Sequence, residues 1–265
     1  MKRAFSILSA LAVLAVIPFA GADNHGDAAK KPKPLRVLML TGGCCHDYKA
    51  QKEVLSAGIG QRANVEFTIV KEDGPGRNTV HQFEMLKKDG WEKDYDAVLY
   101  NICFADVKDV DYITGITDTH KKGLPAVALH CTYHSHHWRA ATDTWEEFLG
   151  VSSPGHGPKA SIKMVPTDDG KKHPVMKGFP DEWTTPKGEL YRVKKVYPTA
   201  TVLAMGDNGK QNQACVWVNE FGDTKLFGTS VGHHTETMAE NVYLDMVARG
   251  LLWTTDNLNE DGTPK

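Results

Sequence analysis

The densest group of residues able to do chemistry is a run of histidines after a short apolar segment. Four of the twelve histidines lie within eight positions, as His130, His134, His136 and His137. They follow the apolar residues 125–129, which predict a buried strand. Imidazole serves for metal ligation and for proton transfer near neutral pH. Because ligands bind at the carboxyl ends of strands in α/β proteins, the run predicts a functional site.

Other titratable residues lie at the ends of other predicted strands, namely His46, His156, Glu189 and His233. In a parallel sheet, the loops after the first and fourth strands open on the same edge. We therefore expect His46 and His130 to converge there. Histidines with one carboxylate suit a divalent metal such as zinc, with an open position for water or a sugar hydroxyl. We expect metal ligands at His46, His130, His156 and His233, and catalytic roles for His130, Glu189 and His233.

Cysteine offers a different chemistry. Cys131 is a candidate nucleophile activated by a histidine, with Glu236 orienting that histidine in the His-x-Glu order of residues 234–236. A nucleophile on a strained strand-to-helix turn needs small neighbours, whereas Cys131 is flanked by His130 and Thr132. We therefore interpret Cys131 as a small buried residue and keep the nucleophile as an alternative.

The cysteines do not predict a disulfide framework. The chain has five, Cys44, Cys45, Cys103, Cys131 and Cys215, each at or near a predicted strand. Adjacent Cys44 and Cys45 cannot easily bridge without strain. Pairing of two of the five in an oxidising compartment stays open, and the sequence does not say which.

The elements that position these residues alternate between strands and helices. Predicted strands at 35–41, 65–70, 95–101 and 125–129 alternate with predicted helices at 49–60, 83–88 and 107–122. Short, continuously apolar strands in this order are typical of a parallel sheet covered on both faces. The second half predicts strands at 160–165, 189–196, 201–205, 214–219 and 225–229, a hairpin turn at 221–223, and a last helix over 236–253.

The ends of the chain predict a secreted or periplasmic protein. Residues 1–22 combine a basic start, an apolar segment and an Ala-Gly-Ala cleavage pattern, so we expect a signal peptide cut after Ala22. Residues 23–34 predict a disordered lead-in, 35–256 one domain, and 257–265 a flexible tail. The net charge of −2 and the scattered lysines argue against nucleic acid. We expect no membrane segment after signal cleavage and no nucleotide cofactor.

The ordered motifs resemble the ThuA-like, trehalose-utilisation family over almost all of the mature chain. The matching stretches are 38–43 followed by His46, 128–130, 145–150 followed by His156, 189–191, 229–233 and 249–253. The resemblance implies a three-layer flavodoxin-like α/β fold related to class I glutamine amidotransferases, with a mainly parallel sheet. It also implies sugar metabolism, including oxidised (3-keto) disaccharides, and general loss of the amidotransferase triad.

We therefore expect a secreted carbohydrate-active protein, with metal-assisted hydrolysis or isomerisation of a (keto-)disaccharide or related sugar. Substrate-binding residues are expected at His46, His134, Trp138 and Tyr191. The first alternative is a sugar-binding module without catalysis, in which Trp138, Trp183 and Tyr191 stack on sugar rings. The second alternative is a hydrolase that depends on Cys131. A homo-oligomer stays open.

Overall fold

The computed structural model describes residues 32–75, 80–136 and 141–265, and residues 33–265 form one unit. The predicted signal peptide, most of the predicted lead-in, His137 and the candidate sugar-stacking residue Trp138 lie outside the described residues. Within the described ranges, no helix is both long enough and apolar enough to cross a membrane.

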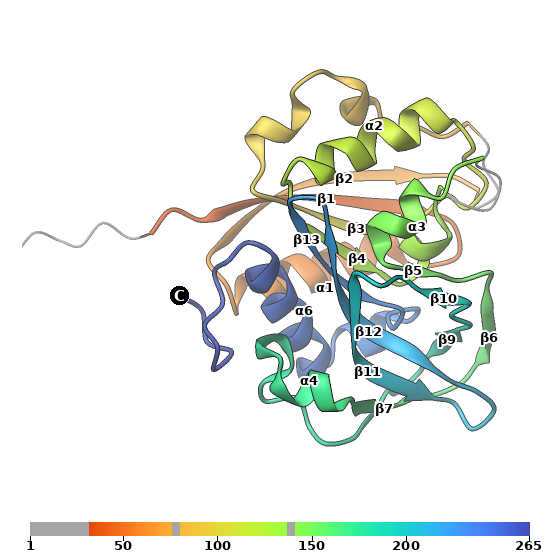
Figure 1. The fold of residues 1–265 in the computed structure, drawn as a ribbon, viewed down its shortest axis with the longest axis vertical. Helices are drawn as coiled ribbons and strands as arrows, with labels where there is room; N and C mark the ends of the chain where they lie inside the picture. Colours follow the sequence, from red (N-terminus) through yellow and green to blue (C-terminus); the bar gives the residue numbers. More distant parts are fainter. Residues whose placement is uncertain (1–31, 76–79, 137–140) are drawn as a thin grey trace, which may run out of the picture. The chain divides into compact units, whose positions relative to one another are not determined.

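A nine-stranded sheet lies at the centre of the fold, in the order β2-β1-β3-β4-β13-β12-β11-β7-β8 (Figure 1). The first five strands of this order run parallel to one another: β1 (Leu35–Gly43), β2 (Val65–Asp73), β3 (Ala97–Cys103), β4 (Ala126–Leu129) and β13 (Thr224–Thr229). The other four pair antiparallel: β7 (Lys163–Pro166), β8 (Trp183–Thr184), β11 (Ala200–Asp207) and β12 (Asn212–Phe221). This confirms the mainly parallel sheet with extra strands in the C-terminal half.

Helices cover both faces of the sheet (Figure 1). One face packs against α1 (Tyr48–Gly60) and α6 (Asn241–Thr254), and the other against α2 (Val110–Lys121) and α3 (Thr144–Leu149). Successive residues of β1 alternate between the two cores: Val37 packs in the cluster of Leu55 from α1, and Leu38 in that of Ile113 from α2. The residues named on both faces of β1 are fully buried, which explains why such strands are apolar throughout. The three-layer α/β fold is confirmed.

Shorter elements complete the chain. They are the helices α4 (Asp168–Lys172) and α5 (Thr235–Met238), and the 3-10 helices η1 (Glu84–Lys87), η2 (Trp91–Asp94), η3 (His130–His134) and η4 (Pro174–Met176). Two small sheets pair β5 (Val151–Ser152) with β10 (Lys195–Val196), and β6 (His156–Lys159) with β9 (Glu189–Tyr191).

Three elements differ from the sequence-based expectation. The predicted strand 189–196 is two short strands in different small sheets, and the predicted helix 83–88 is a 3-10 turn. The predicted last helix is divided because Glu240 has an extended backbone between α5 and α6. The hairpin turn at 221–223 is present as expected, with Gly222 at φ +62° between β12 and β13.

The C-terminal residues 257–265, predicted as a flexible tail, fold back on the domain instead. Leu258 is buried in the same core cluster as α6 and forms a bridge with Pro264. The backbone N–H of Lys265 donates to the carbonyl of Asn257 at 2.9 Å. The burial of Leu258 therefore holds this segment against the domain.

The end of β1 is shaped by two glycines that approach neighbouring backbone closely. A Cβ on Gly43 would lie 2.2 Å from the carbonyl oxygen of Cys103, and one on Gly42 would lie 1.7 Å from that of Glu72. Both glycines also have positive φ, at +101° and +130°, which other residues rarely adopt. These glycines let the chain leave the sheet tightly and place His46 above the strand ends.

Candidate functional site

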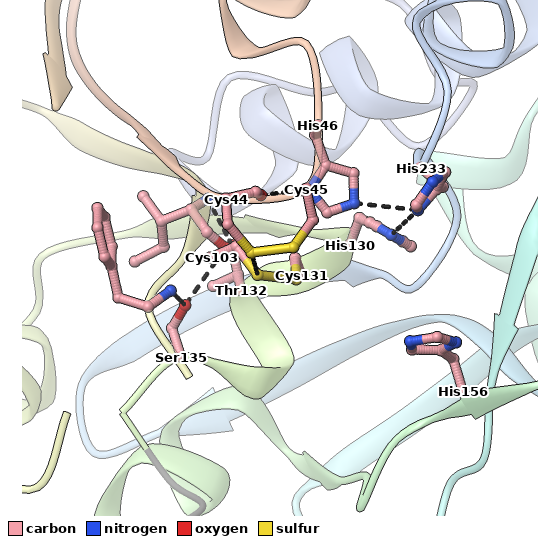
Figure 2. Close-up of a disulfide and its surroundings, with 12 residues drawn as sticks. Cys44, Cys45, His46, Cys103, His130, Cys131, Thr132, Ser135, His156 and His233 are labelled. Atoms are coloured by element: carbon pink, nitrogen blue, oxygen red, sulfur yellow. Dashed lines mark hydrogen bonds between the residues drawn. A yellow bond between two sulfur atoms is a disulfide. The ribbon is translucent and has the colours of Figure 1, made fainter. Parts of the chain in front are cut away.

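The candidate site lies at the carboxyl edge of the parallel strands. His46 follows β1, His130 follows β4 and His233 follows β13, so three loops from one sheet edge each bring one imidazole. Glu189 comes from β9, outside the main sheet. Figure 2 shows His46, His130 and His233 side by side, although up to 187 positions separate them in the sequence. The predicted convergence of His46 and His130 is present, with ring centroids 4.9 Å apart.

The three imidazoles meet through their ring nitrogens. His46 Nε2 lies 3.0 Å from His233 Nδ1, and His130 Nε2 lies 3.3 Å from the same atom. One nitrogen from each of the three rings lies within 4.8 Å of the other two, a donor set that can hold a metal ion. His130 is 1% exposed and His233 9%, whereas His46 is partly exposed.

Backbone carbonyls fix the orientation of two of these rings. His130 Nδ1 lies 2.7 Å from the carbonyl oxygen of Ser230, and His46 Nδ1 lies 3.1 Å from that of Cys44. A carbonyl only accepts, so in both rings the proton sits on Nδ1 and the lone pair of Nε2 faces the centre of the group. The hydroxyl of Tyr48 also contacts His46 Nδ1, at 3.0 Å. Two inward lone pairs of this kind are the arrangement that a metal-binding histidine site needs.

Glu189 is the carboxylate of the site and is only 5% exposed. One of its oxygens, Oε2, lies 3.1 Å from His233 Nδ1 and 3.6 Å from His130 Nε2. The other, Oε1, lies 3.2 Å from His156 Nδ1. The side chain therefore joins the buried His130 and His233 to His156, whose side chain is 42% exposed.

The environment sets the protonation of these groups. Burial, reinforced by the neighbouring His130 and His233, lowers the pKa of His46 from 6.5 to about 2. Burial also lowers the pKa of His130. Burial alone would raise the pKa of Glu189, but its contacts with His130 and His233 outweigh this and hold it below its ordinary value. At neutral pH, His46 and His130 are therefore neutral donors beside an ionised carboxylate.

A pocket of about 580 Å³ opens onto this group. Its wall includes Tyr191, whose ring packs 4.8 Å from that of His130 and 4.4 Å from that of His134. The Tyr191 hydroxyl is buried and has no hydrogen-bond partner among the described residues. A buried polar atom in a pocket wall is a natural contact for a bound ligand. Lys159 also lines the pocket, and no sequence signal singled it out.

The sharp turn after β4 presents a histidine rather than a cysteine. His130 has φ +43°, a rare conformation for a residue with a side chain, and it opens η3. Cys131 is the next residue, is 7% exposed, and is bonded to Cys103 in a disulfide. A cysteine in a disulfide has no thiolate to attack a substrate. Glu236, the expected orienting carboxylate, instead pairs with Lys187 at 2.6 Å, and both side chains are 55% exposed.

The remaining candidate site residues lie in different surroundings, and not all of them reach the pocket. His156 contacts Glu189 and is not part of the three-histidine donor set, contrary to its expected role as a metal ligand. His134 is buried and lines the pocket. His136 is 1% exposed and packs on Trp145. Trp183 is buried in the core and does not line the pocket, so it cannot stack on a ligand there.

Four of the five cysteines gather at the same pocket, which the sequence did not predict. Contrary to the expectation for adjacent cysteines, Cys44 and Cys45 form a disulfide, and Cys103 and Cys131 form a second one (Figure 2). All four line the pocket. Cys215 is free and buried elsewhere.

The fold and the site define a three-layer α/β protein with a histidine and glutamate pocket at the carboxyl edge of its sheet. The family profile described as trehalose utilisation, ThuA, matches residues 36–254. The chain belongs to the ThuA family. No curated protein matches it by sequence.

Solved structures show the same fold at low sequence identity. A ThuA-like protein from Parabacteroides merdae is 19% identical over 88% of this chain and 97% of its own, with a TM-score of 0.60. A ThuA-like protein from Bacteroides uniformis is 14% identical over 90% of this chain and 98% of its own, with a TM-score of 0.61. A carbohydrate deacetylase is 11% identical over 84% of this chain but only 33% of its own, with a TM-score of 0.53.

Proposed function

We propose that this ThuA-family protein is a carbohydrate-active enzyme in which His46, His130 and His233 hold a divalent metal ion, first of all zinc. Its reaction is the hydrolysis or isomerisation of a keto-disaccharide or related sugar. One observation carries the proposal: His46 and His130, each with Nδ1 held by a backbone carbonyl, direct Nε2 lone pairs at a third histidine. Without a cation or a shared proton, such lone pairs repel one another.

The nitrogen separations fit a zinc ion. Zinc–nitrogen bonds of about 2.0–2.1 Å in tetrahedral geometry place two ligand nitrogens roughly 3.3 Å apart. The separations from His233 Nδ1 are 3.0 Å to His46 and 3.3 Å to His130. Three protein nitrogens leave the fourth position for water or substrate, as in catalytic zinc sites.

A bound zinc ion would supply Lewis acidity, polarising a sugar oxygen or lowering the pKa of a water molecule. Glu189, ionised at neutral pH, accepts a proton from the reacting group at Oε2. Its other oxygen contacts His156, which is half exposed and carries protons between the carboxylate and solvent. The Tyr191 hydroxyl donates a hydrogen bond to the bound sugar, because burial raises its pKa and keeps it protonated.

The sugar substrate is supported by family membership and by the pocket. The family is described by trehalose utilisation, and one protein of similar fold is a carbohydrate deacetylase. A volume of about 580 Å³ lies within the range of pockets for small-molecule ligands. The N-terminal pattern, with its expected cleavage after Ala22, supports action in the periplasm or outside the cell.

The test combines metal content with turnover. We expect the purified protein to hold about one zinc ion per chain by elemental analysis, and His130→Ala to lose it. His173→Ala is the matched control, because His173 packs on Trp253 and does not line the pocket. Turnover of a 3-keto-disaccharide should follow the metal content. Sugar binding without turnover in the zinc-loaded protein would contradict the enzyme and favour a binding protein.

A further inference from the structure

The two disulfides contact each other across the end of the sheet. Cys44 and Cys45 follow β1, Cys103 ends β3 and Cys131 follows β4. The Sγ atoms of Cys44 and Cys103, which belong to different disulfides, lie 3.9 Å apart. Figure 2 shows the four sulfur atoms gathered in one place, beside His46 and His130.

The two disulfides differ in their access to solvent. Cys45 is exposed and Cys44 is partly buried, whereas Cys103 is 4% and Cys131 7% exposed. A thiol arriving from solution therefore reaches Cys45 more readily than Cys103 or Cys131, which are nearly buried in the pocket wall. The contact between Cys44 and Cys103 links the outer disulfide to the inner one.

The outer disulfide, between Cys44 and Cys45, contributes little to the stability of the fold. A disulfide stabilises mainly by restricting the unfolded chain, and this effect grows with the length of the closed loop. Cys44 and Cys45 are one position apart and are already tied by a peptide bond, so their disulfide closes almost no loop. The Cys103–Cys131 bond spans 28 positions and does constrain the chain. The Cys44–Cys45 bond has little structural effect and is exposed at a pocket, which suits a chemical role.

We propose that the four cysteines form a thiol–disulfide relay, through which a dithiol in solution reduces the buried Cys103–Cys131 bond by way of Cys44 and Cys45. This activity is independent of the sugar chemistry. It places a redox function in the wall of the same pocket.

The exchange proceeds in four balanced steps. One thiolate of the dithiol bonds to Cys45 Sγ, and the Cys44–Cys45 bond breaks to release the Cys44 thiolate. That thiolate bonds to Cys103 Sγ, and the Cys103–Cys131 bond breaks to release Cys131. The second thiolate of the dithiol then closes its own disulfide and frees Cys45. Finally Cys45 bonds to Cys44 Sγ and releases Cys103, so two electrons have passed from the dithiol to the inner pair.

The first experiment traps the central bond in the full chain. The double variant Cys45→Ser, Cys131→Ser leaves, of the four pocket cysteines, only the two that exchange. With oxidised glutathione as the two-electron oxidant, we expect a Cys44–Cys103 disulfide by mass spectrometry of the unreduced, digested protein. Its control, Cys45→Ser with Cys103→Ser, leaves Cys44 and Cys131 and should form the bond at least tenfold more slowly. Absence of the Cys44–Cys103 bond, or equal rates in the two variants, would overturn the relay.

The second experiment measures the reduction of the inner pair by dithiothreitol, with alkylation and mass spectrometry of Cys103 and Cys131. We expect the rate to fall at least tenfold in Cys44→Ser, Cys45→Ser, because the outer step is lost. Cys215→Ser is the control with an unchanged rate, since that thiol is buried and its pKa is raised by burial. An unchanged rate in the double variant, with circular dichroism like that of the wild type, would show direct attack and refute the relay.

Discussion

Glu189→Gln separates the charge of the central carboxylate from its shape. In the structure, Oε2 of Glu189 lies 3.1 Å from His233 Nδ1, and Oε1 lies 3.2 Å from His156 Nδ1. Glutamine keeps the size of the side chain but offers one acceptor oxygen and one amide nitrogen. His233 Nδ1 is a proposed zinc ligand and carries no proton when zinc is bound, so the substitution removes the negative charge beside the proposed metal ligands and, where the amide nitrogen faces His156, the hydrogen bond from its Nδ1.

The size of the effect follows from these contacts. A hydrogen bond to a charged group contributes about 1.5–3 kcal/mol. Loss of one such bond corresponds to a decrease of roughly 10- to 150-fold in an equilibrium constant. We expect zinc to bind about 10- to 100-fold more weakly to Glu189→Gln. Turnover should fall further still, because the amide cannot accept the proton.

Competition with a chromophoric zinc chelator at pH 7 measures the affinity, and turnover is measured with zinc in excess. Glu236→Gln is the matched control, since Glu236 is an exposed carboxylate paired with Lys187 and does not line the pocket. It should change zinc affinity less than twofold. If Glu189→Gln binds zinc as tightly as the wild type does, the carboxylate does not support the three histidines and our assignment is wrong.

Three further predictions concern stability and the cysteine alternative. Burial lowers the pKa of His120 from 6.5 to about 4. The stability that depends on a neutral His120 is therefore fully present above pH 6.5. As the pH falls towards 4, the free energy of unfolding decreases by about 3 kcal/mol, at 1.36 kcal/mol per pKa unit. Urea unfolding should show this slope in the wild type, and an equal slope in His120→Gln would contradict it. Gly43→Ala should lower the free energy of unfolding by at least 1–3 kcal/mol, because Gly43 has a positive φ and contacts Cys103. Gly115→Ala, in open space on α2, should raise it by about 0.5–1 kcal/mol. Thermal unfolding measures both changes. Turnover in Cys131→Ser should stay within threefold of wild type. Loss of turnover in this variant would support the alternative of a hydrolase that depends on Cys131.

The parallel half of the sheet is predictable because its signal is local. Strands buried on both faces must be apolar at every position, so β1, β3 and β4 stand out from the polar helices and loops between them. Because β1, β3 and β4 run parallel, the loops after β1 and β4 open on the same edge. His46 and His130 are therefore predictable as neighbours from the amino-acid sequence alone.

The other parts of the site depend on contacts that local sequence does not encode. His156 and Glu189 lie on β6 and β9, whose pairing is set by long connections, and their register is irregular. Both residues are candidates from the sequence, but only the structure shows that His156 contacts the Glu189 carboxylate and not the other histidines. The cysteine cluster needs the ends of three strands in register, so reading each cysteine separately as a small buried residue missed it.

The positive φ of His130 decides between the chemistries open to this fold. A strained turn after a central strand presents one side chain to the pocket, and in hydrolases with a nucleophile on this turn that residue is the nucleophile. Here the residue in the strained conformation is His130, at φ +43°, and Cys131 is turned into the contact with Cys103. An imidazole at this position cannot form the acyl intermediate of a cysteine hydrolase with Cys131, but it can direct Nε2 at His233. The turn thus presents the proposed metal ligand His130 where related chemistry needs a nucleophile, and this supports our proposal of metal-assisted over cysteine-dependent catalysis.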